Sequence, residues 1–142
     1  MNKNYAVLLE YVSNQLSYFF PDNVDSSLVL RENICHACQR TEYSISKVKL
    51  RGYTSFDYLH SDLYAQFLYF LSNSVWKNSG DRRLASKLFY LNKALHAFNC
   101  MYDTELPDVF LLIHCVGTVL GKANYSDYFV ACQNVTIGSD RN

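Results

Sequence analysis

The residues best suited to catalysis or ligand binding lie in the last third of the chain. His114 is the only histidine after position 96, and imidazole is the side chain that enzymes use most often as a general base. Asp127 follows within the same region and could orient a histidine or bind an amino group of a ligand. The alternative for both residues is structural, because corner positions favour side chains that hydrogen-bond their own turn.

Three further polar residues follow one another after Asp127. Gln133 and Asn134 carry amides that could contact a substrate, or form amide ladders at an interface between subunits. Cys132 could act as a nucleophile, but the sequence offers it no neighbouring base. We therefore expect Cys132 to face outward or to pack at an interface, and we treat Gln133 and Asn134 as candidate substrate-binding residues.

A metal site is not expected. Cys35, His36 and Cys38 place three possible ligands close together, but structural zinc takes four ligands and usually uses a second such pair. No second pair follows in the sequence. Because Cys35 and Cys38 would share one side of a helix, their simpler role is packing in the protein interior.

Composition excludes several classes of partner. Thirteen basic residues balance thirteen acidic ones, so the chain has no net positive charge that would favour binding to nucleic acid. No apolar run approaches the roughly 18–20 residues that a membrane span needs. The first residues do not form a signal peptide, and five cysteines form no disulfide framework. These features predict a cytoplasmic protein.

The first hundred residues predict helices. Apolar residues recur at three- and four-residue spacing, the period of one helix face, in four segments. The predicted segments are 5–19, 34–48, 63–75 and 84–98, separated by Pro21, by a loop over 51–61 and by the polar residues 78–81. Ser61 and Asp62 could cap the third helix, and Asp81 could cap the fourth.

From Leu106 onward the apolar spacing becomes six residues, which fits neither a helix nor a simple strand. A three-sided parallel β-helix accounts for it, because each flat side uses about six residues. Gly117 suits one of its tight corners. One series consists of Ile113, Val119, Tyr125, Ala131 and Ile137, and the other of Leu111, Gly117, Ala123, Phe129 and Val135.

The fold class predicted from these patterns is α+β. An all-α helical domain over 1–105 precedes the first coils of a left-handed parallel β-helix over 106–142, about two coils long and incomplete. Such a solenoid needs roughly three or more repeats. We therefore consider that the sequence is the front part of a longer protein, that another chain covers the coil edge, or that the coils pack on the helices.

The transition between the two regions resembles a known family. Helices that run directly into six-residue repeats are similar to the serine acetyltransferase-like branch of the hexapeptide acyltransferases. The segments that carry this resemblance are Lys87–His96, Glu105–Pro107, Ile113–His114, Val116–Ala123, Tyr125–Val130 and Gln133–Gly138. The resemblance covers about residues 82–138, and upstream of these it rests on helical content alone.

The resemblance implies an acetyl-CoA-dependent O-acetyltransferase that acts on the hydroxyl of serine or of a sugar. It implies a homotrimer with sites between subunits, acetyl-CoA as co-substrate, and a histidine base that a carboxylate orients. His114 and Asp127 are the candidates for these two roles in this chain. This chain departs from the family where Leu112 replaces an aspartate before the Ile-His pair, and where no histidine follows His114. The alternative is therefore a catalytically inactive relative that serves as an assembly or regulatory module.

Overall fold

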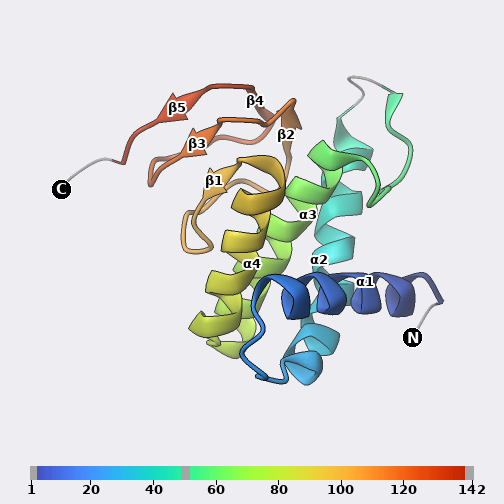
Figure 1. The fold of residues 1–142 in the computed structure, drawn as a ribbon. Coiled ribbons are helices and arrows are strands. Elements are labelled where there is room, and N and C mark those ends of the chain that lie inside the picture. Colours follow the sequence, from blue (N-terminus) through green and yellow to red (C-terminus); the bar gives the residue numbers. More distant parts are fainter. Residues whose placement is uncertain (1–2, 49–51, 140–142) are drawn as a thin grey trace.

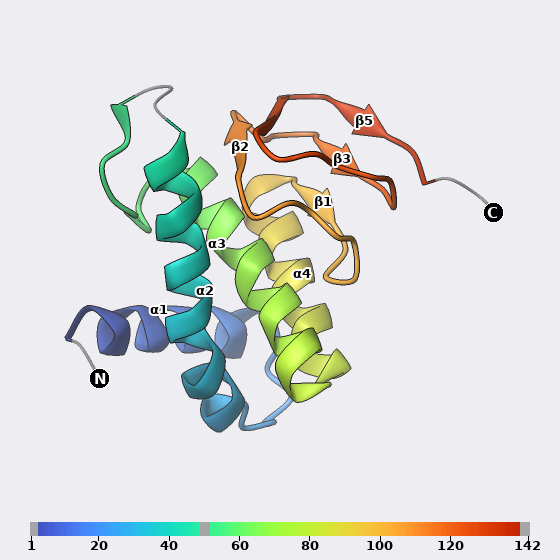
Figure 2. The same ribbon diagram turned by 180° about the vertical axis from the view of Figure 1, so that it is seen from behind.

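The computed structural model describes residues 3–48 and 52–139. Within these residues four α-helices form the body of the molecule, and short strands lie against one end of it (Figures 1 and 2). No helix of the described segments is both long enough and apolar enough to cross a membrane. The helices are α1 (Lys3–Phe19), α2 (Ser27–Lys47), α3 (Ser61–Ser74) and α4 (Arg82–His96), and a π-helical turn, η2 (Val75–Ser79), extends α3.

The helical periodicity of the first hundred residues is confirmed. In α4, Leu84, Leu88 and Leu91 are buried on one face, as their spacing predicts. Asp81 caps this helix, because its carboxylate accepts a hydrogen bond from the backbone amide of Leu84 at 2.9 Å. The helix ends at His96, because Ala97 takes the left-handed conformation with a φ of 51°.

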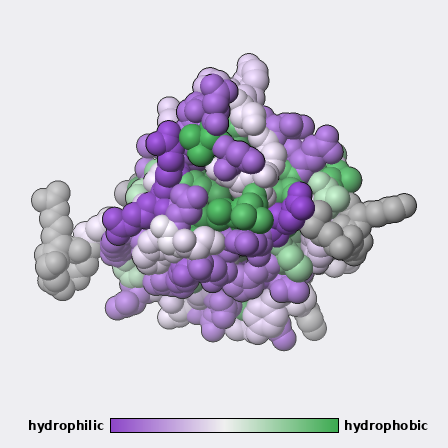
Figure 3. Space-filling view, turned by 90° about the horizontal axis from the view of Figure 1, so that it is seen from below, coloured by the Kyte–Doolittle hydropathy of each residue, from purple (hydrophilic) through white to green (hydrophobic). Residues whose placement is uncertain are grey.

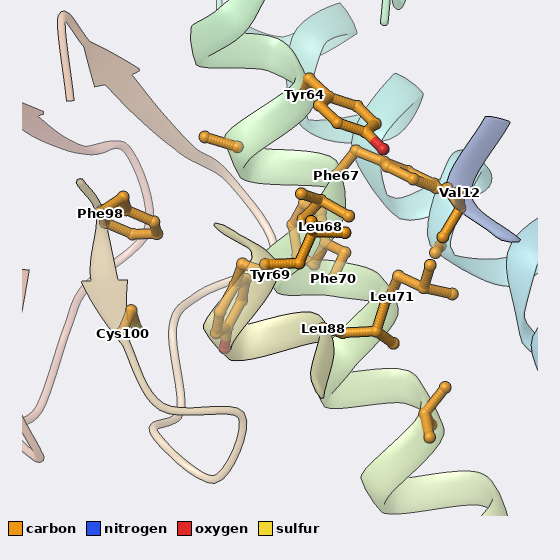
Figure 4. Close-up of a cluster of buried hydrophobic side chains, with 14 of the residues drawn as sticks. Val12, Tyr64, Phe67, Leu68, Tyr69, Phe70, Leu71, Leu88, Phe98 and Cys100 are labelled. Carbon is orange, nitrogen blue, oxygen red and sulfur yellow. The ribbon is translucent and has the colours of Figure 1, made fainter. Parts of the chain in front are cut away.

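Helix α3 is the centre of the fold. It packs against α2 on one side and α4 on the other, and every residue from Asp62 to Ser74 is buried. Its large apolar side chains fill the interior between the other helices (Figure 4). The side chains of α3 labelled there are Tyr64, Phe67, Leu68, Tyr69, Phe70 and Leu71. An α-helix that is enclosed all round must find an internal partner for each polar side chain it carries.

The strands pair in parallel and form two small sheets. One sheet has the order β1-β3-β5 and the other pairs β2 with β4. In both views the strands form a layer over one end of the helices, with β1 beside α4 and β5 furthest from it (Figures 1 and 2). The strands are β1 (Asn99–Cys100), β2 (Phe110–Ile113), β3 (Val119–Leu120), β4 (Phe129–Cys132) and β5 (Thr136–Ile137).

The prediction of a left-handed β-helix over 106–142 is wrong. Across the described residues the strands are two to four residues long and lie in two small sheets, and no β-helix coils are evident. A regular coil needs a constant offset between paired strands. Here the offset is 20 residues from Asn99 to Val119, 19 from Phe110 to Phe129, and 17 from Val119 to Thr136.

The apolar side chains of the strand layer explain this difference. A β-helix encloses its own interior, whereas Ala131 of the six-residue series belongs to the same buried cluster as the helices, and Phe129 packs against that cluster. Ile137 and Tyr125 pack against that cluster from outside. The six-residue spacing therefore places side chains on the helical body, and β1 begins this layer before residue 106 by pairing with β3.

The opposite end of the molecule presents a different surface. Figure 3 views the molecule from that side and shows a small hydrophobic area within a mainly hydrophilic face. Two apolar residues near this end are exposed: Val24, in the connection from α1 to α2, and Leu28, in the first turn of α2. Isolated exposed side chains of this kind are normal for a folded protein.

A buried carboxylate fastens the strand layer to α3. The sequence predicts Ser61 and Asp62 as the cap of this helix, but His60 is its N-cap and forms no capping hydrogen bond through its side chain. The carboxylate of Asp62 instead accepts the backbone amides of His114 at 2.9 Å and of Cys115 at 3.1 Å. Asp62 is only 5% exposed, so these bonds form largely out of water.

We expect Asp62→Ala to lower the free energy of unfolding by about 3 kcal/mol, because two amides lose a charged acceptor in a buried place. Asp62→Asn keeps one acceptor oxygen and should cost less. Urea unfolding followed by circular dichroism measures both changes. The control is Asp127→Ala, whose carboxylate is exposed and should be dispensable for stability. Equal stability of the Asp62→Ala variant and the original chain would show that this contact does not hold the layer.

Candidate functional site

The two predicted catalytic residues lie at opposite ends of one sheet. His114 directly follows β2, and Asp127 precedes β4. Because β2 and β4 run parallel, with Phe110 opposite Phe129, the end of β2 is remote from the start of β4. Four residues of a parallel strand span about 13 Å, whereas a histidine and its orienting carboxylate must be within hydrogen-bond reach. The fold therefore does not bring this pair together.

His114 lies at the corner where the chain leaves β2. Its φ is 50°, and its backbone amide donates to Asp62, so its main chain is held by the helical body. The residue itself is exposed. Gln133 leaves β4 at the same end, because Ile113 and Cys132 are opposite each other in the register. His114 and Gln133 are thus the two predicted site residues that the topology places at one edge.

Asn134 has a structural role at a second corner. Its backbone amide donates to the carbonyl of Val116 at 3.0 Å, and its side chain lies over Gly117. A β-carbon on Gly117 would stand 2.3 Å from Oδ1 of Asn134. Gly117 also has a φ of 74°, a conformation that glycine adopts without strain. These contacts stack successive turns of the strand layer, and both Gln133 and Asn134 remain exposed to solvent.

The cysteines offer no activated nucleophile in the interior. Burial, and next the neighbouring carboxylate of Asp62, raise the pKa of the Cys115 thiol to about 12. Burial also raises the pKa of Cys38 to about 12, with a smaller contribution from Cys35. These thiols stay protonated at neutral pH, and a protonated thiol is a poor nucleophile and metal ligand. Cys132 is exposed on β4, as its position next to the buried Ala131 predicts.

The segment from Cys35 to Cys38 lies within α2. Cys38 faces the core, and His36 lies near the amide of Asn78, with a nitrogen–nitrogen distance of 3.3 Å. Burial, and then the charge of Arg40, lower the pKa of His36. Throughout residues 3–48 and 52–139, no three side chains of histidine, cysteine, aspartate or glutamate are grouped so that they could hold a metal ion.

The sequence prediction missed the outer edge of the strand layer. We use this name for the sides of β4 and β5 that face away from β2 and β3. The carbonyls of Val135 and Ile137 accept the amides of Val119 and Gly121, both at 2.8 Å. Because successive residues of a strand point their backbone groups to opposite sides, the amide and carbonyl of Thr136 point away from β3. The signal in the sequence is that neither β4 nor β5 contains a charge or a proline.

We expect Gly117→Ala to lower the free energy of unfolding by about 1–3 kcal/mol, because the added methyl group meets Asn134 and the positive φ is strained. Adding Asn134→Ala should recover only the part that is due to the clash. Gly138→Ala is the matched control, since no atom lies within 4 Å of its new methyl group. Thermal unfolding of the four proteins compares them, and a neutral Gly117→Ala variant would contradict this account of the corner.

Comparison with family models, with curated proteins and with solved structures finds no match to this chain. The function of this chain is therefore inferred from its geometry. That geometry separates His114 from Asp127, uses Asn134 in a corner, and leaves the backbone of Thr136 directed outward.

Proposed function

We propose that this chain is an assembly module that forms a homo-oligomer through the outer edge of its strand layer. One observation supports the proposal. Strand β5 pairs with β3 on one side and directs the backbone amide and carbonyl of Thr136 to the other side. In the described part of the chain, β4 likewise pairs with β2 alone. Unpaired strand edges are templates for pairing with another chain.

The composition of these strands supports the proposal. Proteins that stay monomeric usually protect edge strands with lysine, proline or a bulge. The sequences Phe-Val-Ala-Cys of β4 and Thr-Ile of β5 contain none of the protective residues. Near this edge Tyr128 and Val130 are 63% and 41% exposed, so a second copy would cover apolar surface as well as backbone groups. A second copy presents the same edge, as self-complementary contacts require.

The positions of the candidate catalytic residues favour this function over catalysis. Acetyl transfer of the kind that the family resemblance implies needs a base, its orienting group and the acceptor within a few ångströms of one another. His114 and Asp127 lie at opposite ends of β2 and β4, and each is exposed. Neither the structure nor the comparisons test the acetyl-CoA use or the trimeric state that the family resemblance implies.

We expect the wild-type chain to form an oligomer in solution and Thr136→Pro to be monomeric. Proline removes the outward amide of residue 136 without removing a hydrogen bond between β3 and β5. Thr136→Val keeps the amide and the size of the side chain, so this matched control should keep the wild-type mass. Light scattering coupled to size-exclusion chromatography measures all three, with circular dichroism to verify folding. A wild-type chain that stays monomeric at high concentration would refute the proposal.

For acetyl transfer we expect no release of the CoA thiol above background when the chain is mixed with acetyl-CoA and either serine or a hexose. The reason is the separation of His114 from Asp127. A colorimetric thiol assay detects the product, with His114→Ala and Asp127→Asn in parallel. If the wild-type chain turns over acetyl-CoA and both substitutions abolish this activity, the chain is an enzyme. The inference from the separation of His114 and Asp127 would then be wrong.

A further inference from the structure

A pocket of about 510 Å³ opens between α1, α2 and the segment 56–58. This volume lies within the range of about 300–1,000 Å³ typical of small-molecule sites. The pocket is separate from the strand layer and from every residue discussed as a catalytic candidate. Its lining combines aromatic rings, aliphatic side chains and carboxylates, and consists of Tyr5, Val7, Leu8, Cys38, Glu42, Phe56, Asp57 and Tyr58.

Two of the aromatic rings are held in place by the core. Phe56 stacks on the buried Phe67 with ring centroids 5.1 Å apart, and Tyr58 packs against Tyr11 at 4.9 Å. The thiols of Cys35 and Cys38 lie beside Tyr5, whose pKa is raised first by burial and then by these neighbours. The phenol is therefore neutral at physiological pH. The pocket thus offers preformed aromatic walls, which can bind a cation through their π faces.

Among the described residues that line the pocket, the charged side chains are both acidic. Glu42 accepts the backbone amide of Phe56 at 3.0 Å, and Asp57 accepts that of Leu59 at 2.9 Å. Each bond uses one carboxylate oxygen, and among the described residues no hydrogen bond engages the other oxygen of either carboxylate. Neither carboxylate forms an ion pair with any residue in the described segments, and no lysine, arginine or histidine is among the described lining residues.

A second cavity of the molecule provides the contrast. A hollow of about 250 Å³ beside the connection from α1 to α2 also contains an aspartate, Asp22. There, Arg83 and Lys87 each lie 2.8 Å from the Asp22 carboxylate, so its charge is already balanced. No described residue compensates the charges of Glu42 and Asp57 in this way, and a cationic ligand would do so.

We propose that this pocket binds an organic ammonium ion with an apolar body. The ammonium group lies between the carboxylates of Glu42 and Asp57, where it donates to their remaining oxygens. The apolar body lies against Phe56, Tyr58 and Leu8. A free amine and the side chain of a lysine share this chemistry, and the experiment distinguishes them.

Isothermal titration calorimetry of the full chain with phenethylammonium tests the proposal, and 2-phenylethanol serves as the neutral analogue. We expect saturable binding of the ammonium ion and no measurable binding of the alcohol. Capped lysine, N-acetyl-lysine methylamide, is titrated in parallel. If capped lysine binds more tightly than phenethylammonium, the natural ligand is a lysine side chain of a protein. If it binds more weakly, the natural ligand is a free amine.

Glu42→Gln and Asp57→Asn should each weaken binding of phenethylammonium about three- to fivefold, which is the effect of losing a partly exposed charge pair. Glutamine keeps an acceptor oxygen for the amide of Phe56, so the segment should stay in place. Glu32→Gln is the matched control, because Glu32 is an exposed carboxylate of the same helix outside the pocket, and it should leave the affinity unchanged. Absence of binding, equal binding of the alcohol, or equal effects of all three substitutions would overturn the proposal.

Discussion

The rest of this structure depends on the complete burial of α3. Its apolar side chains account for much of the core, but the helix also carries Gln66, Ser72 and Asn73, which are 1% exposed or less. A buried polar group without a partner costs about 1–3 kcal/mol, so the neighbours of α3 must supply hydrogen bonds at fixed positions. Ser72 donates to the carbonyl of Ala85 in α4 at 2.9 Å, and Asn73 donates to that of Tyr102 at 2.8 Å.

This constraint also positions the strand layer. The side-chain amide of Gln66 donates both to the hydroxyl of Ser44 in α2 and to the carbonyl of Phe110 at the start of β2. At the other end of β2, Asp62 accepts the amides that follow the strand. Asp62 and Gln66, one turn apart on α3, thus form hydrogen bonds at the two ends of β2. Strand β4 is positioned in turn by its pairing with β2. The layer is an extension of the helical core.

The sequence predicts the helices well because one helix face is a local property. The cap at Asp81 and the stripe from Leu84 to Leu91 follow from spacing alone. The strand layer differs, because a six-residue spacing states which side chains point inward but not what they meet. Ala131, which the spacing assigns to the β-helix interior, instead belongs to the core that the helices form. The site prediction depended on that fold. His114 and Asp127 are close in the sequence, but the parallel register of β2 and β4 places them at opposite ends of these strands.

The proposed assembly edge and the proposed ammonium pocket occupy different parts of the molecule. Thr136 lies in the strand furthest from α4, whereas Glu42 and Tyr58 belong to α2 and the segment before α3 (Figures 1 and 2). None of the described residues that line the pocket belongs to β4 or β5. Because α3 packs on Phe56 through Phe67 and on β2 through Gln66, one rigid helix supports both sites. An assembly of such chains would present one pocket for each copy, which raises the effective concentration of binding sites for any ligand that carries several ammonium groups.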